Sequence, residues 1–192
     1  ESRQELSELL SNASNIVIGP GLGQSEWAQE MLTEVLAQDL PMVVDADALN
    51  LLAKQPSQNK KWILTPHPGE AARLLSCTIN EIQHDRYDSI TKLKEQYDGV
   101  VILKGRGTLI AAKQELIGVC AEGNPGMASG GMGDVLSGII GGLIAQGLSK
   151  ANATRLAVCI HTAAADKAAK KSGERGLLAS DLMPWIHNLV NP

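Results

Sequence analysis

The feature that most constrains the fold is an alternation of short apolar runs with longer helix-like segments. The apolar runs cover residues 15–18, 42–44, 62–64 and 100–103, and the helix-like segments between them cover residues 25–38, 48–54, 69–76 and 85–97. Strands separated by helical crossovers pair in parallel. Phenylalanine is absent and aromatic residues make up only 3% of the chain, which favours the aliphatic core of a buried parallel sheet. The sequence therefore predicts an α/β fold, with a mostly parallel sheet flanked by helices.

The second half of the chain is expected to change character. Residues 108–112 and 116–120, divided by the polar residues 113–115, predict an antiparallel hairpin at the sheet edge. Helical patterns then cover residues 135–146, 152–172 and 181–190. No repeat or low-complexity linker interrupts the 192 residues, so we expect residues 1–192 to form a single domain.

Charge and cysteine usage exclude several kinds of partner. The 17 Lys and Arg against 21 Asp and Glu give a net charge of -4 without a basic cluster, which argues against nucleic acid. Cys77, Cys120 and Cys159 lie far apart and form no ligand-spaced motif, as expected of free thiols in a reducing compartment. The longest apolar run, residues 135–145, is too short and glycine-rich to span a bilayer. We expect a cytoplasmic protein that binds no membrane.

Four unusual loops follow the four predicted parallel strands. They read GPGLG at residues 19–23, DADALN at 45–50, TPHPGE at 65–70 and KGRGT at 104–108. In doubly wound sheets the loops that leave the carboxyl ends of parallel strands collect on one rim, and ligands bind there. The sequence therefore predicts a functional site at this rim.

A glycine cluster precedes the first helix of the second half. Gly130, Gly131 and Gly133 can adopt left-handed torsions and turn their N–H groups toward an anion, which the following helix dipole also attracts. The loop lacks the Lys-Ser/Thr of a Walker A motif. Asp134 follows directly, either as a catalytic base or as an ordinary helix cap. The loop alone leaves both interpretations open.

The residues of the other loops also carry alternatives. Gly19, Gly21 and Gly23 either let a ligand approach the backbone or simply form a strand-to-helix turn. His67 lies between two prolines that restrict its backbone, which suits a side chain aimed at a ligand. Lys104 is either a phosphate ligand or a solvated surface lysine.

Two further predictions concern carboxylates and a second histidine. One of Asp45 and Asp47 is expected to cap the next helix, with Asp47 favoured, while the other faces the rim and orients a ligand or a Mg ion through water. His161, in a helical run, is interpreted as a satisfied core histidine.

Taken in order, these motifs, ending in GNPGMASGGMGDVLSG at residues 123–138, resemble the NAD(P)H-hydrate dehydratase family. This is a ribokinase-like domain often found behind an NAD(P)H-hydrate epimerase domain in bacteria, and the resemblance runs from about residue 15 to the C-terminus. It implies repair of hydrated NADH or NADPH. The ring hydroxyl is phosphorylated, with ADP as donor and Mg²⁺ as metal, and phosphate is then eliminated.

The resemblance also implies roles for individual residues. It assigns the hydrated dinucleotide to Gly23, His67 and Asp134, and the carboxylate chemistry favours Asp134 as catalytic base. Nucleotide binding is expected from two segments: Lys104, Gly105, Arg106, Gly107 and Thr108 in the first, and Gly130, Gly131 and Gly133 in the second. The resemblance identifies no metal ligand in this chain, and it implies a homo-oligomer.

The chain departs from the family pattern at its beginning. Family domains start with further strands and another glycine-rich loop, whereas this chain starts at Glu1 and has a short helical lead-in at residues 4–10. We expect the domain to be N-terminally incomplete, with the missing part supplied by a separate segment or joined to an epimerase domain.

Two other functions remain open from the sequence. A kinase of the same fold that acts on a vitamin-precursor hydroxymethyl group would use the same glycine loop and aspartate. A nucleotide-binding module without catalysis is the second. The sequence does not separate ADP from ATP, or NADH hydrate from NADPH hydrate.

Overall fold

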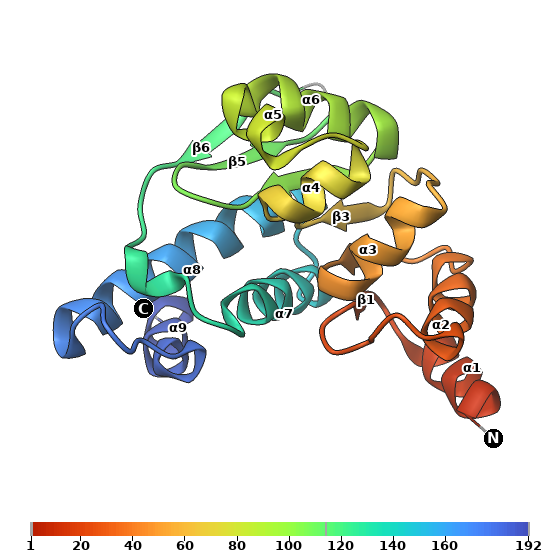
Figure 1. Ribbon diagram of the computed structural model, residues 1–192. Coiled ribbons are helices and arrows are strands. Elements are labelled where there is room, and N and C mark those ends of the chain that lie inside the picture. Colours follow the sequence, from red (N-terminus) through yellow and green to blue (C-terminus); the bar gives the residue numbers. More distant parts are fainter. Residues whose placement is uncertain (1, 114, 192) are drawn as a thin grey trace.

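A single sheet lies at the centre of the computed structural model, which describes residues 2–113 and 115–191 (Figure 1). Its strands are β1 (Ile16–Ile18), β2 (Met42–Val44), β3 (Trp62–Leu64), β4 (Val100–Leu103), β5 (Thr108–Ala111) and β6 (Gly118–Cys120), and they lie side by side in this order. Strands β1 to β4 are parallel, while β5 runs antiparallel to both β4 and β6. The predicted α/β fold with a mostly parallel sheet is confirmed.

Helices cover both faces of this sheet. They are α1 (Ser2–Asn12), α2 (Glu26–Leu36), α3 (Ala46–Lys54), α4 (Pro68–Leu74), α5 (Ile79–His84), α6 (Arg86–Tyr97), α7 (Met132–Ala145), α8 (Lys150–Ser172) and α9 (Met183–Val190), with 3-10 turns at Pro125–Met127 and Ala179–Leu182. None of these helices is long and apolar enough to cross a membrane.

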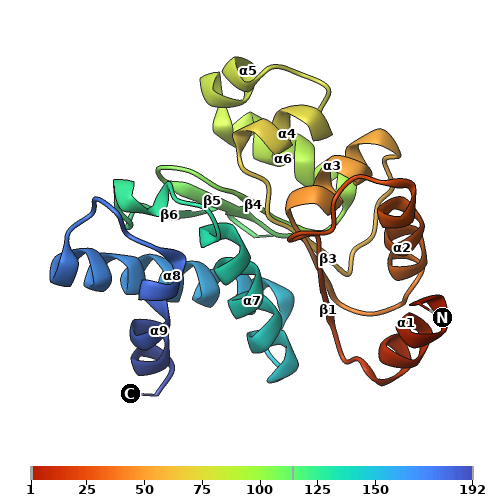
Figure 2. The same ribbon diagram turned by 60° about the horizontal axis from the view of Figure 1, so that its bottom comes forward.

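The core has two layers because alternate residues of a strand point to opposite faces. Met42 and Val44 pack with the helices α2 to α6 in one apolar cluster. Val43, between them, packs on the other face against α7 and α8, and Figures 1 and 2 show these two helix layers on either side of the sheet. Both clusters are mostly aliphatic, although the fully buried Trp62 and Tyr97 belong to the first.

The strand order corrects one part of the sequence-based picture. A doubly wound sheet reverses its strand order, whereas β1 to β4 follow one another across the described sheet without a reversal. When each right-handed crossover leads to the next strand on the same side, all the crossover helices lie on one face of the sheet. This places α2 to α6 together and leaves the second face to α7 and α8. The carboxyl ends of the parallel strands still share one rim.

Element boundaries also differ from the prediction. The expected hairpin is β5 and β6, but β5 also pairs with β4, so KGRGT is itself a turn between antiparallel strands. The turn expected at residues 113–115 includes residue 114, which lies outside the described residues. Helix α7 begins at Met132 rather than at residue 135, and this places Asp134 inside its first turn.

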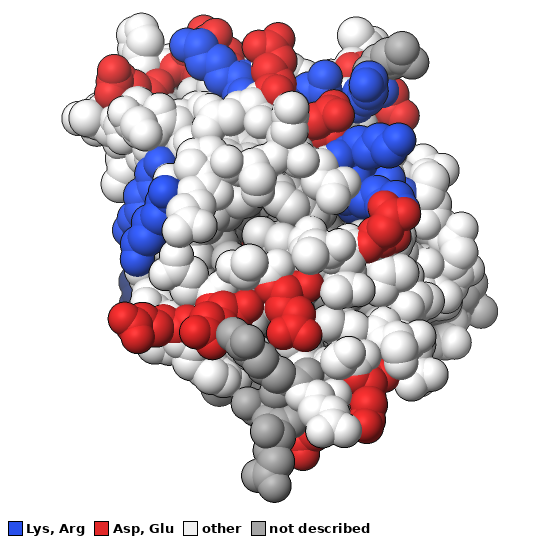
Figure 3. Space-filling view, turned by 90° about the vertical axis from the view of Figure 1, so that its right-hand side faces the viewer, with Lys and Arg blue, Asp and Glu red and all other residues white. Residues whose placement is uncertain are grey.

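Charge is mixed on the face that Figure 3 shows. Lys and Arg side chains lie along its upper part and at both sides, Asp and Glu side chains lie among them at the top and right, and a row of Asp and Glu crosses the lower left and centre of this face. On this face, apart from the atoms drawn in grey, the Lys and Arg side chains form no continuous patch.

Candidate active site

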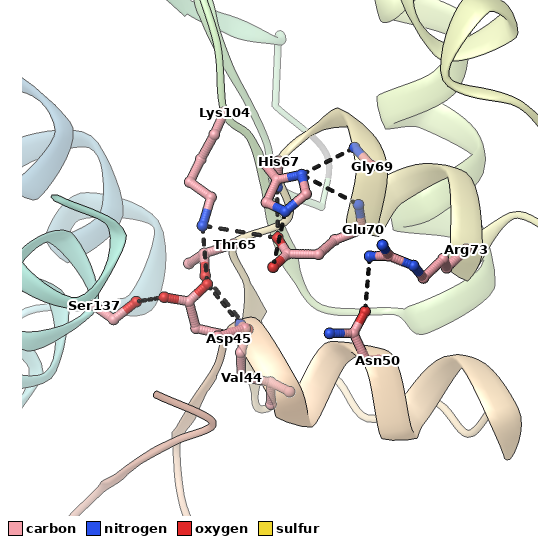
Figure 4. Close-up of polar contacts among 11 residues, drawn as sticks. Val44, Asp45, Asn50, Thr65, His67, Gly69, Glu70, Arg73, Lys104 and Ser137 are labelled. Carbon is pink, nitrogen blue, oxygen red and sulfur yellow. Dashed lines mark hydrogen bonds and ion pairs between the residues drawn. The ribbon is translucent and has the colours of Figure 1, made fainter. Parts of the chain in front are cut away.

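The carboxylate of Asp45 lies at the centre of a polar cluster on the carboxyl-end rim (Figure 4). Its Oδ1 accepts hydrogen bonds from Lys104 Nζ at 2.9 Å and from the Ala46 backbone N–H at 2.9 Å. Its Oδ2 accepts one from Ser137 Oγ at 2.7 Å. Asp45 is only 1% exposed. The ends of β2 and β4 and the first turns of α7 therefore meet at one buried carboxylate.

Asp45 keeps its charge despite its burial. Burial alone would raise the pKa of this carboxyl, but the Lys104 ammonium and the hydrogen bonds from Ser137 and Thr65 hold the pKa below its ordinary value. A buried charge is tolerated when it is paired and hydrogen-bonded. Asp45 also caps α3, which corrects the expectation that Asp47 would do so.

The ammonium of Lys104 lies between two carboxylates. Its Nζ is 2.9 Å from Asp45 Oδ1 and 3.9 Å from Glu70 Oε2, and its side chain is only 21% exposed. The backbone N–H of Lys104 donates to the Pro66 carbonyl at 2.9 Å, which joins the loop after β4 to the loop after β3. The alternative of a solvated surface lysine is therefore wrong.

His67 and Glu70 form a capping box at the start of α4. The His67 backbone N–H donates to Glu70 Oε2 at 2.8 Å, while His67 Nδ1 accepts from the N–H groups of Gly69 at 2.9 Å and Glu70 at 3.3 Å. His67 Nε2 lies 3.3 Å from Glu70 Oε1. Because the Nδ1 of His67 accepts hydrogen bonds, it carries no proton. The neutral imidazole ring therefore has its proton on Nε2, facing Glu70.

The protonation of this pair follows from its surroundings. Burial, Lys104 and Arg73 lower the pKa of His67, and burial raises the pKa of Glu70 against the opposing effect of Lys104. The His67 side chain is 51% exposed, so a ligand can reach the ring. Both ring nitrogens are already engaged by the protein, which leaves the exposed ring carbons and ring face for a ligand.

The glycine cluster brings the helix N-terminus against Lys104. A Cβ on Gly133 would lie 3.2 Å from Lys104 Nζ and 3.7 Å from Asp45 Oδ2, which is tight against the ammonium. Gly131 is the N-cap of α7 and has φ +83°, whereas Gly130 and Gly133 do not have positive φ. The expected left-handed torsion is thus found only at Gly131. The positive end of the α7 dipole and the ammonium group of Lys104 lie side by side.

Asp134 is the third residue of α7 and does not cap it, because Gly131 is the N-cap. Its side chain is exposed and hydrogen-bonds to none of the residues that the structure describes. An acidic side chain in the first turn is favoured by the helix dipole. The carboxylate is thus open to solvent next to Gly133, where it can accept a proton from a bound hydroxyl.

The loop after β1 is tied to the same rim through α3. The Gly23 N–H donates to Asp47 Oδ2 at 2.9 Å. A Cβ on Gly19, which has φ +126°, would lie 1.7 Å from the Asp45 carbonyl oxygen, so the close approach at Gly19 is to the chain itself. Gly21 and Gly23 have positive φ and open space where a Cβ would stand. The alternative of a turn is right for Gly19.

The backbone is strained beside the central carboxylate. Ala46 has φ 47°, in the left-handed region that residues with a Cβ rarely adopt. Such strain costs on the order of 1 kcal/mol and persists where surrounding contacts fix the backbone. Ala46 is the first residue of α3 and directly follows Asp45, whose side chain is fixed by its hydrogen bonds, so the strain accompanies the placement of Asp45.

Asp45 was expected to face the rim if Asp47 capped the helix, and it both faces the rim and caps α3. Two other polar residues of the site, Glu70 and Ser137, were not predicted as site residues. Glu70 follows His67 at capping-box spacing, which was an available signal. Ser137 is 92 residues from Asp45 in the chain, and nothing in the sequence links the two.

The interpretation of His161 as a satisfied core histidine is half right. The residue is 6% exposed, but its Nε2 has no hydrogen-bond partner among the described residues. Burial lowers the pKa of His161 to about 4, against the opposing effect of the Met132 backbone. The ring is therefore neutral at pH 7 and packs beneath the start of α7.

The sheet order and the rim site define a ribokinase-like α/β protein. A family model described as NAD(P)H-hydrate dehydratase matches residues 1–188. The chain belongs to this family, as the sequence motifs predicted.

Individual relatives agree with this assignment. The chain is 60% identical over 188 residues to the bifunctional NAD(P)H-hydrate repair enzyme Nnr of Coxiella burnetii, an alignment that covers 98% of this chain and 38% of that protein. It is 41% identical over 186 residues to the ADP-dependent (S)-NAD(P)H-hydrate dehydratase of Neisseria meningitidis, covering 91% of this chain and 63% of the relative. The chain thus spans less than two thirds of either relative.

A solved structure matches both the fold and the family. It is the ADP/ATP-dependent NAD(P)H-hydrate dehydratase from Bacillus subtilis, co-crystallised with ATP and Mg²⁺. The TM-score is 0.84 at 34% identity, over 93% of this chain and 64% of that one.

Proposed function

We propose that this chain carries out the ADP-dependent dehydration of hydrated NADH or NADPH. The observation that carries the proposal is the meeting of Lys104, Asp45 and Gly133 at the N-terminus of α7, one residue before the exposed Asp134. A phosphoryl group needs positive charge and N–H donors around it, and the hydroxyl that attacks it needs a base. This rim supplies both within one turn of a helix.

The proposed first step is transfer of the β-phosphoryl group of ADP to the hydroxyl of the hydrated nicotinamide ring. Asp134 accepts the hydroxyl proton, the new P–O bond forms, and AMP leaves with the electrons of the broken bond. The N-terminus of α7 and Lys104 stabilise the charge on the transferred group. In the second step, the C–O bond breaks, phosphate departs with its electron pair, and loss of a ring proton restores the double bond.

The two substrates are proposed to approach from different loops. Gly23 and His67 contact the hydrated dinucleotide, since their loops leave β1 and β3 and His67 is half exposed. The adenine nucleotide lies along the turn from Lys104 to Thr108 and against the glycines before α7. Lys104 and Gly133, which are in close contact, join these two nucleotide-binding segments.

Mg²⁺ fits this proposal through its usual mode of binding. The described residues contain no group of three or more His, Cys, Asp or Glu side chains placed to hold a metal. Mg²⁺ is commonly held by one or two carboxylates together with substrate phosphates and waters, and it neutralises phosphate charge when bound. Asp45 and Glu70 already use their oxygens for Lys104, Ser137 and His67, so they would hold the ion through water and not directly.

The test of the catalytic base is Asp134→Asn. The amide keeps the size of the side chain and cannot accept the proton, so we expect turnover to fall about 100-fold to 10,000-fold while ADP still binds. Turnover and ADP affinity are measured on the same preparation. Near-normal turnover in this variant would remove Asp134 from the mechanism.

A further inference from the structure

Arg86 is the first residue of α6, and its side chain reaches the turn that joins β4 to β5. Its Nη2 donates to the Leu103 carbonyl at 3.0 Å and to the Gly107 carbonyl at 3.1 Å. These two carbonyls flank the segment of residues 104–106. One guanidinium nitrogen therefore holds the two ends of the turn together.

The turn is shaped to receive this guanidinium. Gly105 has φ +134°, and a Cβ built on it would lie 2.7 Å from Arg86 Nη1. The absent Cβ thus makes room for the guanidinium. Gly107 has φ +68° and open space where its Cβ would stand, while Thr108 Oγ1 donates to the Gly105 carbonyl at 3.0 Å. The turn is fixed from the Arg86 side and open at Gly107.

The charge of Arg86 is not neutralised within the described part of the chain. Asp85 and Asp88 are near in sequence, but the structure pairs neither with the guanidinium, and Asp85 Oδ1 instead accepts from the Asp88 N–H. Burial lowers the pKa of Arg86, so the surroundings do not compensate its loss of solvation. A partly buried guanidinium bonded only to carbonyls favours an anion nearby.

We propose that Arg86 is a positioning residue for the phosphates of the nucleoside diphosphate. It fixes the shape of the turn from Lys104 to Thr108 and adds a second positive charge to that of Lys104. This inference rests on the proposed function only in taking that turn as the nucleotide site. It predicts that Arg86 affects nucleotide affinity and leaves binding of the hydrated dinucleotide nearly unchanged.

The experiment compares Arg86→Met, Arg86→Lys and Gly105→Ala with the wild type in the full-length protein. Affinity for ADP is measured by titration of a fluorescent ADP analogue, and KM is measured separately for ADP and for hydrated NADH. The matched control is Lys92→Met, which removes one positive charge from the same helix but from an exposed pair with Asp88.

We expect Arg86→Met to weaken ADP binding by about 10-fold to 100-fold, as for the loss of hydrogen bonds from a charged donor. Arg86→Lys should recover part of this loss because it keeps the charge without the planar fork. Gly105→Ala should also weaken ADP binding. In Arg86→Met the KM for hydrated NADH should stay within about twofold of the wild-type value. The affinity of Lys92→Met for ADP should also stay within about twofold of the wild type, because an exposed ion pair contributes little.

Unchanged ADP affinity in Arg86→Met would overturn the proposal, as would an equal loss for ADP and hydrated NADH. If Arg86→Met does not fold, Arg86→Lys carries the same test. A wild type that binds ADP but restores no hydrated NADH would contradict the dehydratase proposal alone, and the ADP titrations would still decide the role of Arg86.

Discussion

At the scale of single residues, the site depends on Asp45, a buried carboxylate with one ammonium partner. Asp45→Asn keeps the shape but removes the charge, which leaves Lys104 beside Glu70 alone. We expect the free energy of unfolding to fall by about 2 kcal/mol, since breaking a buried ion pair leaves its partner uncompensated. Urea unfolding at pH 7 measures this change.

Asp39→Asn is the matched control for this prediction. Asp39 also pairs with a lysine, Lys61, at 2.7 Å, but its side chain is 91% exposed. Exposed ion pairs contribute little to stability, so we expect a much smaller loss in this variant. Equal losses in the two variants would show that the burial of Asp45 does not matter.

The role of a residue was predictable where its local sequence pattern allows only one role. Thr78 and Glu81 form a capping box at the start of α5, and their spacing of three residues is a local signal of this kind. The partners of Asp45 were not predictable, because Lys104 is 59 and Ser137 is 92 residues away. A carboxylate after a strand caps a helix, binds a cation or pairs with a lysine, and the contacts of distant segments decide among these.

At the scale of elements, the first turn of α7 is held against Lys104 because Gly133 has no side chain. Gly133→Ala adds a methyl group 3.2 Å from Lys104 Nζ, so the ammonium or the helix must shift. We expect the KM for ADP to rise about 10-fold, as when one charge-assisted hydrogen bond is lost. Steady-state kinetics with varied ADP measure this.

Gly138→Ala is the control in the same helix. A Cβ there would meet nothing within 4 Å, so we expect unchanged kinetics and a gain of up to about 1 kcal/mol in stability, because alanine favours the helix. Equal kinetic losses in both variants would contradict a specific contact between Gly133 and Lys104.

The existence of most elements followed from the sequence, and their arrangement did not. The apolar runs at β1 to β4 and the helical patterns between them are local signals, so both were predicted. The start of α7 was placed three residues late because glycines disguise a helix N-terminus. Strand order depends on the direction of each crossover, which no local pattern encodes.

At the scale of the whole molecule, the buried His161 makes stability depend on pH. Its folded pKa of about 4 lies below the ordinary value of 6.5, so between these values the unfolded chain binds the proton that the folded chain rejects. The free energy of unfolding is thus expected to fall by about 3 kcal/mol from this residue as the pH drops from 6.5 to 4. Below that range its contribution no longer changes.

Urea unfolding of the wild type and of His161→Gln across this pH range isolates the contribution. Asp45 and Glu70 also titrate on acidification, but they are present in both proteins and cancel in the difference. We expect a shallower pH dependence in His161→Gln. Parallel curves for the two proteins would show that His161 is not buried as a neutral ring.

The proposed activity of this rim is the restoration of damaged NADH or NADPH with ADP as phosphoryl donor. The most direct measurement incubates the full-length protein with hydrated NADH and ADP, follows NADH absorbance, and assays AMP and phosphate. We expect absorbance to return as AMP and phosphate appear in equal amounts. A stable phosphorylated product without restored absorbance would indicate a small-molecule kinase, and ADP binding without any turnover would contradict the proposed activity.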